Sequence, residues 1–371
     1  MSSSRQSEHY IPTLDGWRAV AIGLVMASHA TDAFRTWLAG FGVDYAFPID
    51  LGTLGVQIFF ALSGFLITTK MLDSEARGGF SMRAFYVRRV FRILPASMLF
   101  LALMGALALA GVLDFTLGRW LSTVFFLANY ATATPSWYLG HFWSLAVEEH
   151  FYMLWPLAFV RLRSSRRRLA AVCAMIAGVA LWRAIAFKLF VPGFDPAIFW
   201  GRTDIVADAL LGGVAVSLAW RDDTWRSRLQ RLLANPFAAW ALVVAVALVD
   251  AARPADWKLG FVLLSVKFAL LPLAILSTVV RPHGVPGRVL EWSVLRWVGL
   301  VSYSLYLYQQ LFLVHDEFAV PRLHVLQAAP LDIAFALLAG WASYRLVETP
   351  MIKVGQRVLQ GLKRRSQAAA A

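Results

Sequence analysis

Long uncharged apolar runs constrain this chain more than any other feature of its sequence. They include Ile93 to Leu113, Trp120 to Val147 and Trp297 to Val314. A helix needs about 20 consecutive apolar residues to cross a lipid bilayer. Of the 371 residues, 59% are hydrophobic and only 15% are charged, which is too apolar for a water-soluble domain of this size. The sequence therefore predicts an all-α integral membrane protein that crosses the bilayer several times.

We expect about ten transmembrane helices. The predicted spans are residues 14–31, 51–69, 93–112, 143–160, 169–190, 204–220, 236–252, 258–280, 295–315 and 331–350. The apolar segment 120–142 contains Pro135 and Gly140, so we expect a re-entrant or half-length helix there. With this arrangement the inner segments carry most of the Lys and Arg residues, and each outer segment carries one. This asymmetry predicts that both termini are cytoplasmic.

The net charge of +13 lies in short basic clusters between the apolar runs. Such clusters are typical of membrane topology signals, so we expect contact with lipid and no nucleic-acid partner. One membrane domain is predicted over residues 1–355, followed by a basic cytoplasmic tail at 356–371. The single cysteine, Cys173, excludes a disulfide framework and a cysteine metal site.

Ionisable side chains inside the spans are candidate functional residues, because each costs on the order of 3 kcal/mol to insert. Arg18 and His29 stand eleven residues apart in the first span. That spacing is close to three helical turns, so both side chains share one helix face, roughly 16 Å apart. Alternatively, Arg18 extends to the inner headgroups and His29 packs as a neutral histidine.

Glu148, Glu149 and His150 stand consecutively in the fourth span. Adjacent helical residues point about 100° apart, so the three side chains cannot all face one cavity. Either carboxylate can orient a histidine, as in a hydrolytic triad. Alternatively, the carboxylate is protonated, or pairs with Arg183 or Arg202, in a structural role.

A basic cluster of Arg88, Arg89 and Arg92 follows the second span. Arg89 and Arg92 are three residues apart and point the same way on a helix, so they can clamp the phosphates of an anionic ligand. The alternative is an orientation signal that contacts anionic lipid. At the outer mouth of another span, Arg202 and Asp204 can form either an ion pair or part of a site.

A metal reading of His141, Glu148 and His150 matches no known helix motif, so we expect no metal site. Four other residues are candidate cavity-lining or acceptor-binding groups, with packing as the alternative for each. They are Ser63, Asn129, Trp137 and Tyr138.

Seven segments, taken in order, resemble the acyltransferase-3 family of multipass inner-membrane O-acyltransferases, which modify surface polysaccharides and other glycans. The segments are LDGWRAVAIGLVMASHA (14–30), GVQIFFALSGFLIT (55–68), RRVFRILPA (88–96), HFWSLAVEEHFYMLWP (141–156), RTDIVADALLGG (202–213), VGLVSYSLYLY (298–308) and VETP (347–350). The ordered set covers nearly the whole chain.

The resemblance implies that an acyl group, usually acetyl, passes from cytosolic acyl-coenzyme A to a carbohydrate hydroxyl at the outer face of a bacterial inner membrane. Acyl-coenzyme A would be a co-substrate, and no resident cofactor is expected. His29 would be the central catalytic residue, Arg18 would belong to the site, and Arg89 and Arg92 would lie on the donor side. Family members usually carry a histidine where this chain has Gln309.

The resemblance also fits a simple reaction. A neutral His29 would take the proton of the acceptor hydroxyl as that hydroxyl attacks the thioester, with Glu148 or Glu149 as the orienting carboxylate. A transient acyl-histidine is a second route. We expect no extracellular hydrolase-like domain of the kind fused to some relatives, so the membrane domain or a separate partner would complete delivery.

Two alternatives remain open. Intramembrane Arg, His, Glu and Asp residues also fit a proton-coupled secondary transporter or flippase. A third reading keeps the acyl transfer but replaces the glycan by a small hydrophobic acceptor such as a macrolide.

Overall fold

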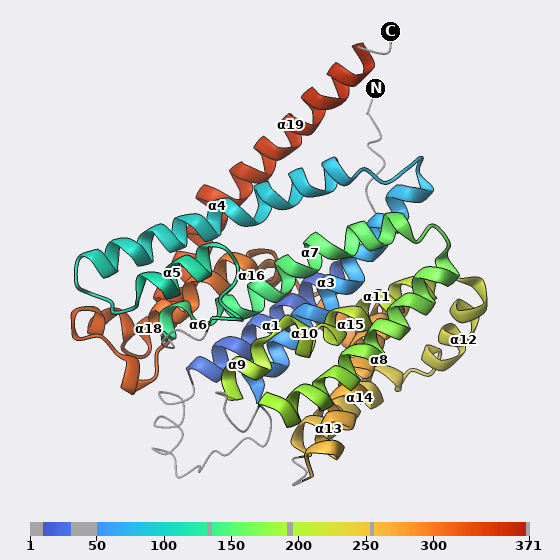
Figure 1. The fold of residues 1–371 in the computed structure, drawn as a ribbon, viewed down its shortest axis with the longest axis horizontal. Helices are drawn as coiled ribbons and strands as arrows, with labels where there is room; N and C mark the ends of the chain where they lie inside the picture. The colour runs from blue at the N-terminus through green and yellow to red at the C-terminus, as the bar shows by residue number, and fades with distance from the viewer. Residues whose placement is uncertain (1–9, 31–49, 132–135, 191–195, 253–255, 369–371) are drawn as a thin grey trace.

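The computed structural model describes residues 10–30, 50–131, 136–190, 196–252 and 256–368 (Figure 1). All regular structure in these ranges is helical. The longer helices are α1 (Pro12–His29), α3 (Leu51–Ala76), α4 (Met82–Leu109), α7 (Phe142–Arg161), α8 (Ser165–Phe190), α11 (Asp208–Arg221), α12 (Asp223–Leu233), α13 (Ala238–Ala251), α14 (Trp257–Val280), α16 (Ser293–Phe312), α18 (Leu331–Ser343) and α19 (Thr349–Ala368).

Short helices connect several of these elements. They are α5 (Leu117–Val124), α6 (Trp137–Gly140), α9 (Pro196–Gly201), α10 (Thr203–Val206), α15 (Val285–Leu290), α17 (His324–Gln327), the 3₁₀ turns η2 (Asp316–Phe318) and η3 (Pro321–Leu323), and the π-helical turn η4 (Tyr344–Glu348). Residues 356–368 of the predicted tail belong to α19.

Each predicted span overlaps a helix, but fewer helices are by themselves apolar and long enough to cross a bilayer. Among the described residues α3, α4, α8 and α14 meet that standard, and the number reaches six if each of two bent helix pairs is one span. Two of these, α3 and α4, carry candidate site residues, whereas α7, with Glu148, Glu149 and His150 near its middle, does not meet the standard. Ten spans and cytoplasmic termini stay predictions.

The segment 120–142 is interrupted, as the sequence predicts. The eight-residue helix α5 ends at Val124, the chain then leaves helical structure, and the four-residue helix α6 begins at Trp137. Neither helix approaches the length that a bilayer crossing needs. Pro135, one of the two residues on which this prediction depended, lies outside the described residues.

The centre of the bundle is built from α1, α3, α11 and α16. Helix α1 packs against both α3 and α16, and α3 packs against α11. Glycines permit the closest of these approaches: a Cβ atom at Gly64 of α3 would lie 1.9 Å from the Leu210 carbonyl oxygen, and one at Gly213 of α11 would lie 2.2 Å from that of Ala61. Small residues at helix crossings bring backbones together in membrane proteins.

The antiparallel course of α1 and α3 defines two ends of the bundle. His29 closes α1 at one end, where Asp50 caps α3 by accepting a hydrogen bond of 3.0 Å from the Thr53 amide. Arg18 lies toward the other end, together with the beginning of α4. We call these the histidine end and the arginine end. Figure 1 shows α4 and α19 running side by side along one edge of the bundle.

Candidate active site

A cavity of about 90 Å³ lies toward the arginine end, and we call it the arginine cavity. Arg18 enters it from α1, Arg89 and Arg92 from α4, and Glu148 and Glu149 from α7. The prediction that Arg89 and Arg92 point the same way is therefore confirmed, and Arg18 joins them from a separate helix. Three guanidinium groups face two carboxyl groups in one small space.

Arg88 does not share this position. It is an exposed residue of α4 and is absent from the residues that line the arginine cavity. A helical neighbour of Arg89 points about 100° away from it, which accounts for this difference. A part for Arg88 in donor binding stays a prediction.

Glu148 is held inside the arginine cavity by two hydroxyl groups. Ser63 donates a hydrogen bond of 2.7 Å to one carboxylate oxygen, and Tyr152 donates one of 2.9 Å to the other. The Arg89 guanidinium lies over the Tyr152 ring, 4.6 Å from its centroid. Ser63, predicted as a cavity-lining residue, is therefore a partner of Glu148 at the cavity wall.

Glu149 lines the same cavity but is bonded differently. One of its carboxyl oxygens is buried and has no hydrogen-bond partner among the described residues. An unpartnered buried carboxyl oxygen is costly to keep in a structure. Neither Glu149 nor Glu148 pairs with Arg183 or Arg202, because Arg183 pairs with Asp208 and Arg202 with Asp204.

A second cavity, of about 360 Å³, lies at the histidine end, and we call it the histidine cavity. The described residues that line it are Val25, Ser28, His29, Asp50, Gly52, Thr53, Val56, Arg119, Ala128, Asn129, Ala131, Ser136, Gly140, His141, Trp143, Gly201, Tyr306 and Gln310. It is large enough to admit a small substrate beside the His29 ring.

The His29 ring is fixed by α16 and α6. Its Nδ1 atom lies 2.7 Å from Oε1 of Gln309, and its ring packs edge-on against Trp137 with centroids 5.1 Å apart. Because Oε1 only accepts hydrogen bonds, the contact assigns the proton to Nδ1 and leaves the Nε2 lone pair for chemistry. Trp137 in turn donates a 3.1 Å hydrogen bond to the carbonyl oxygen of Gln310.

This contact corrects the expected role of the two carboxylates. Glu148 and Glu149 both line the arginine cavity, whereas the hydrogen-bond partner of the His29 ring is the amide of Gln309. Neither carboxylate orients His29 in this structure, because both project from α7 toward the arginine end. Gln309 occupies the position at which the family usually carries a histidine, and it is 280 residues from His29 in sequence.

Val56 and Tyr306 line both cavities, so the two spaces meet at these side chains. The Tyr306 hydroxyl lies 2.5 Å from that of Ser144, and it donates a 3.2 Å hydrogen bond to the His141 carbonyl oxygen. Arg18 and His29 share a helix but line different cavities, one on each side of Val56 and Tyr306. This arrangement can bring a group held at the arginine end within reach of a group held at the histidine end.

Sequence reasoning missed Arg119 of the histidine cavity and considered His141, which also lines it, only as a metal ligand. The Arg119 side chain is buried and donates a 3.2 Å hydrogen bond to the Ala128 carbonyl oxygen, while its Nε has no partner among the described residues. Burial lowers the pKa of the Arg119 guanidinium below its ordinary value, although an arginine keeps its charge in proteins. His141 is also buried, and neither of its ring nitrogens makes a hydrogen bond of ordinary geometry within the described residues. For Arg119 the available sequence signal was its position as a lone charge directly before the interrupted apolar segment 120–142.

The other predicted cavity residues divide into two groups. Asn129 lines the histidine cavity, and Trp137 packs on the His29 ring. Tyr138 is buried and donates a 2.7 Å hydrogen bond to the Phe318 carbonyl oxygen, so it anchors the 3₁₀ turn η2 and faces neither cavity.

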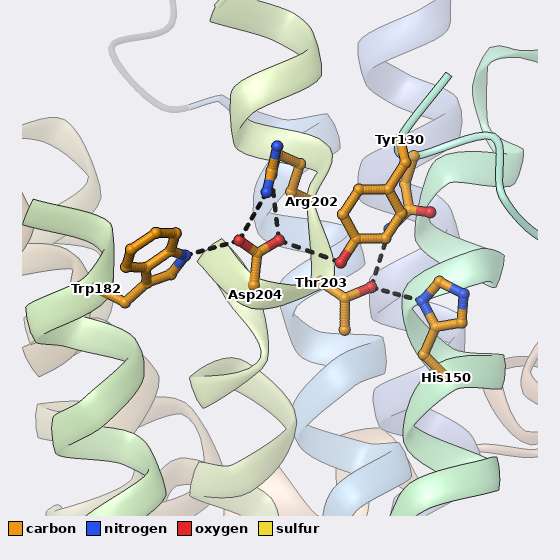
Figure 2. Close-up of polar contacts among 7 residues, drawn as sticks. Tyr130, His150, Trp182, Arg202, Thr203 and Asp204 are labelled. Atoms are coloured by element: carbon orange, nitrogen blue, oxygen red, sulfur yellow. Dashed lines mark hydrogen bonds and ion pairs between the residues drawn. The ribbon is translucent and has the colours of Figure 1, made fainter. Parts of the chain in front are cut away.

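Arg202 and Asp204 form a polar cluster of their own (Figure 2). Asp204 accepts hydrogen bonds from Arg202 at 2.9 Å, from Trp182 at 2.7 Å and from Tyr130 at 3.1 Å. The carboxylate thereby ties α8 and the segment after α5 to the beginning of α10. Both residues are absent from the two cavities, which favours the ion-pair alternative.

His150 joins this cluster and not the arginine cavity. Its Nδ1 lies 2.7 Å from the Thr203 hydroxyl, which also accepts a 2.9 Å hydrogen bond from the Asn129 amide (Figure 2). His141, Glu148 and His150 thus take three separate environments. No cluster of three His, Cys, Asp or Glu side chains suited to a metal ion occurs in the described ranges.

Comparison with known proteins supports the family resemblance. The putative peptidoglycan O-acetyltransferase YrhL of Bacillus subtilis is 31% identical to this chain, and the match covers 96% of the chain and 57% of that protein. The peptidoglycan O-acetyltransferase OatA of Listeria monocytogenes is 26% identical over 95% of the chain and 57% of its own length. A putative O-acetyltransferase of Staphylococcus aureus, SACOL0978, is 27% identical over 94% and 58%.

The chain therefore spans somewhat more than half the length of these relatives. No solved structure matches it. The family model that describes an acyltransferase domain matches residues 11–342, a range that contains Arg18, His29 and both cavities. This chain belongs to the acyltransferase-3 family.

Proposed function

We propose that this chain transfers an acyl group, acetyl in the first instance, from acyl-coenzyme A to a hydroxyl of a cell-surface or lipid-linked carbohydrate. The observation that carries the proposal is the meeting of the arginine cavity and the histidine cavity at Val56 and Tyr306. The named activity of the peptidoglycan O-acetyltransferase relatives supports a glycan acceptor.

The donor would bind from the arginine end. The arginine cavity has room for the thioester end of the donor but not for its nucleotide head. The phosphates of coenzyme A would therefore stay near the mouth, where Arg89 and Arg92 offer fork-shaped hydrogen-bond donors. The pantetheine arm would extend past Glu148 toward Tyr306, and the predicted topology places this end of the bundle in the cytoplasm.

The acceptor would bind in the histidine cavity, with its hydroxyl beside Nε2 of His29. The Gln309 contact leaves that nitrogen free of a proton, so it can take the proton of the hydroxyl. The hydroxyl oxygen attacks the thioester carbon, the ester C–O bond forms and the C–S bond breaks. The coenzyme A thiolate leaves and takes the proton back from His29, so the histidine is regenerated.

A second route uses His29 as a nucleophile. Nε2 would attack the thioester first, release coenzyme A and hold the acyl group until the acceptor hydroxyl displaces it. Both routes need the same ring orientation, and both place the reacting carbonyl near Tyr306.

The test uses the purified full chain in lipid nanodiscs, acetyl-coenzyme A labelled in its acetyl group, and a panel of soluble glycans. We expect label on a glycan hydroxyl, with one free coenzyme A released for each ester formed. His29→Ala should lower transfer by about 10²-fold to 10⁴-fold, while His324→Ala, a change at an exposed histidine of α17, should leave it unchanged.

Three outcomes would contradict parts of the proposal. Near-wild-type transfer by folded His29→Ala protein would remove the histidine mechanism. Movement of a solute across vesicles without release of coenzyme A would favour the transporter alternative. Label on a macrolide, and on none of the glycans, would keep acyl transfer but replace the acceptor class.

A further inference from the structure

A third cavity, of about 770 Å³, lies beside the histidine cavity, and we call it the tryptophan cavity. Asp50, Thr53 and Trp143 line both spaces, so they adjoin along the beginning of α3 and α7. The remaining walls come mainly from the ends of α8, α9, α13 and α14 at the histidine end. The acyl-transfer mechanism proposed above gives this cavity no role.

Three indole rings form much of the wall: Trp143, Trp200 and Trp257. Their neighbours hold two of them in place. Trp257 stacks on Phe187 with centroids 5.3 Å apart, and Trp200 packs edge-on against Phe261 at 5.8 Å. Trp200 nevertheless keeps 39% of its surface exposed. Ordered and partly uncovered rings are suited to contact a flat apolar face of a ligand.

Two acceptor oxygens among the polar residues that line this cavity, one of Asp250 and one of Gln57, have no hydrogen-bond partner within the described residues. One carboxylate oxygen of Asp250 pairs with the Lys267 ammonium, and the other is buried with no partner among the described residues. The Asp250 side chain is only 6% exposed. Gln57 is 7% exposed, and its side-chain oxygen is also unpartnered within the described part of the chain.

These features select the chemistry of a ligand. Buried acceptors need hydrogen-bond donors, and hydroxyl groups supply them. Lys267 already neutralises Asp250, and Asp50 adds a negative charge, so a phosphate or carboxylate ligand is disfavoured. An alkyl chain would leave both acceptor oxygens unsatisfied. A pyranose ring has apolar C–H faces for the indoles and equatorial hydroxyl groups for the acceptors.

We infer that the tryptophan cavity binds an uncharged sugar unit of the acceptor glycan, next to the unit that receives the acyl group. This inference rests on the proposed function, because the acylated sugar is assigned to the histidine cavity. Since the two cavities share Asp50, Thr53 and Trp143, one glycan chain can extend across both. The site would then make acceptor affinity depend on glycan length.

Binding is measured first, separately from chemistry. The protein is the full chain with the substitution His29→Ala, held in nanodiscs. The probes are β-1,4-linked N-acetylglucosamine and glucose oligomers of one, two and four units, and calorimetry measures their affinities. We expect tetramers of at least one series to bind about tenfold more tightly than monomers, a gain on the scale of one aromatic stacking contact. Trp257→Ala should bring tetramer affinity down to the monomer level, and Trp257→Phe should restore part of it.

Two further variants separate binding from folding. Gln57→Leu removes an unpartnered buried oxygen, so it should leave the melting temperature unchanged or raised while weakening tetramer binding. Trp225→Ala, at an exposed tryptophan of α12 near the arginine end, should change neither the melting temperature nor tetramer binding. A purely structural role for Gln57 gives the opposite result, a lower melting temperature with unchanged binding.

The outcomes distinguish this inference from the proposed function. If wild-type protein acylates glycans without any preference for length, and Trp257→Ala does not alter the Michaelis constant for the tetramer, the inference is overturned and the transferase stands. Equal binding of monomers and tetramers in both series also overturns it. Length-dependent binding in a chain that acylates no glycan would support the sugar site and overturn the proposed transferase.

Discussion

The Nδ1 atom of His29 lies 2.7 Å from the amide oxygen of Gln309. The two residues stand on α1 and α16, which pack along each other through the centre of the bundle. Gln309 is completely buried, and its amide nitrogen has no partner among the described residues. The His29 contact is therefore the main feature that fixes this side chain, and it selects the tautomer that the proposed reaction needs.

Replacing Gln309 tests that selection. Gln309→Leu should lower the turnover rate by on the order of 10²-fold, less than the roughly 10⁴-fold loss that a wrong tautomer causes in a Ser-His-Asp triad. The loss is smaller because an amide does not stabilise an imidazolium as a carboxylate does. Gln309→His should keep much of the activity, since an imidazole nitrogen can accept the same hydrogen bond. Steady-state kinetics in nanodiscs measures both, and full activity of Gln309→Leu would show that another group orients the ring.

The two cavity arginines of α4 should act on donor binding. Arg89→Ala and Arg92→Ala should raise the Michaelis constant for acetyl-coenzyme A more than they lower the turnover rate, because a phosphate contact is equally strong in ground and transition states. Raising the salt concentration should increase the Michaelis constant for acetyl-coenzyme A less in these variants than in the wild type, since fewer charges remain to be screened.

Arg88 and Arg83 give the matched comparison on the same helix. Arg88→Ala should have a smaller effect than Arg89→Ala, because Arg88 lies outside the arginine cavity. Arg83→Ala, at an exposed position five residues before Arg88, serves as the charge control. Equal effects of all four variants on donor binding would indicate that these arginines act only as a general membrane-orientation signal.

The local parts of the site could be predicted from sequence. Arg89 and Arg92 share a cavity because residues three apart on one helix point the same way, whatever the rest of the fold does. The interruption of segment 120–142 was also predicted, although Gly140 ends the short helix α6 and Pro135 lies outside the described residues. The family itself could also be predicted, since the acyltransferase model matches residues 11–342.

The contacts between distant helices could not be predicted in this way. The His29–Gln309 pair is 280 residues apart in sequence and depends on how α1 and α16 pack, which no periodicity records. Glu148 and Glu149 line one cavity despite pointing about 100° apart, because the cavity extends around that part of α7. Arg119 enters the histidine cavity from a short helix whose position depends on tertiary packing.

Chemical labelling tests the predicted topology. After Cys173, the only cysteine, is replaced, a cysteine at Ser164 between α7 and α8 should be shielded from an impermeant thiol reagent in intact cells. A cysteine at the exposed Ala319, near the histidine end, should be labelled. Both should react after the cells are permeabilised. Labelling at Ser164 from outside would show that the orientation or the span count is wrong.

The two carboxylates of α7 give the last prediction. Glu148 accepts hydrogen bonds from Ser63 and Tyr152, whereas one oxygen of Glu149 is buried without a partner among the described residues. Glu148→Gln keeps the shape but weakens two hydrogen bonds made to a carboxylate, each worth about 1.5–3 kcal/mol. We expect the protein to express and to lose turnover, because Glu148 positions the wall along which the acyl group would pass.

Glu149→Gln should behave differently. It removes the negative charge near Arg89 at a side chain with one unpartnered oxygen among the described residues, so it should alter donor binding or stability more than turnover. Ser63→Ala supplies a control for Glu148, since it deletes one of the same hydrogen bonds from the other side and should show a smaller loss in the same direction. Turnover and thermal unfolding of the three purified variants decide the matter. Full transfer by Glu148→Gln, with loss in a folded Glu149→Gln, would reverse the assignment, and full activity in both would make the pair structural.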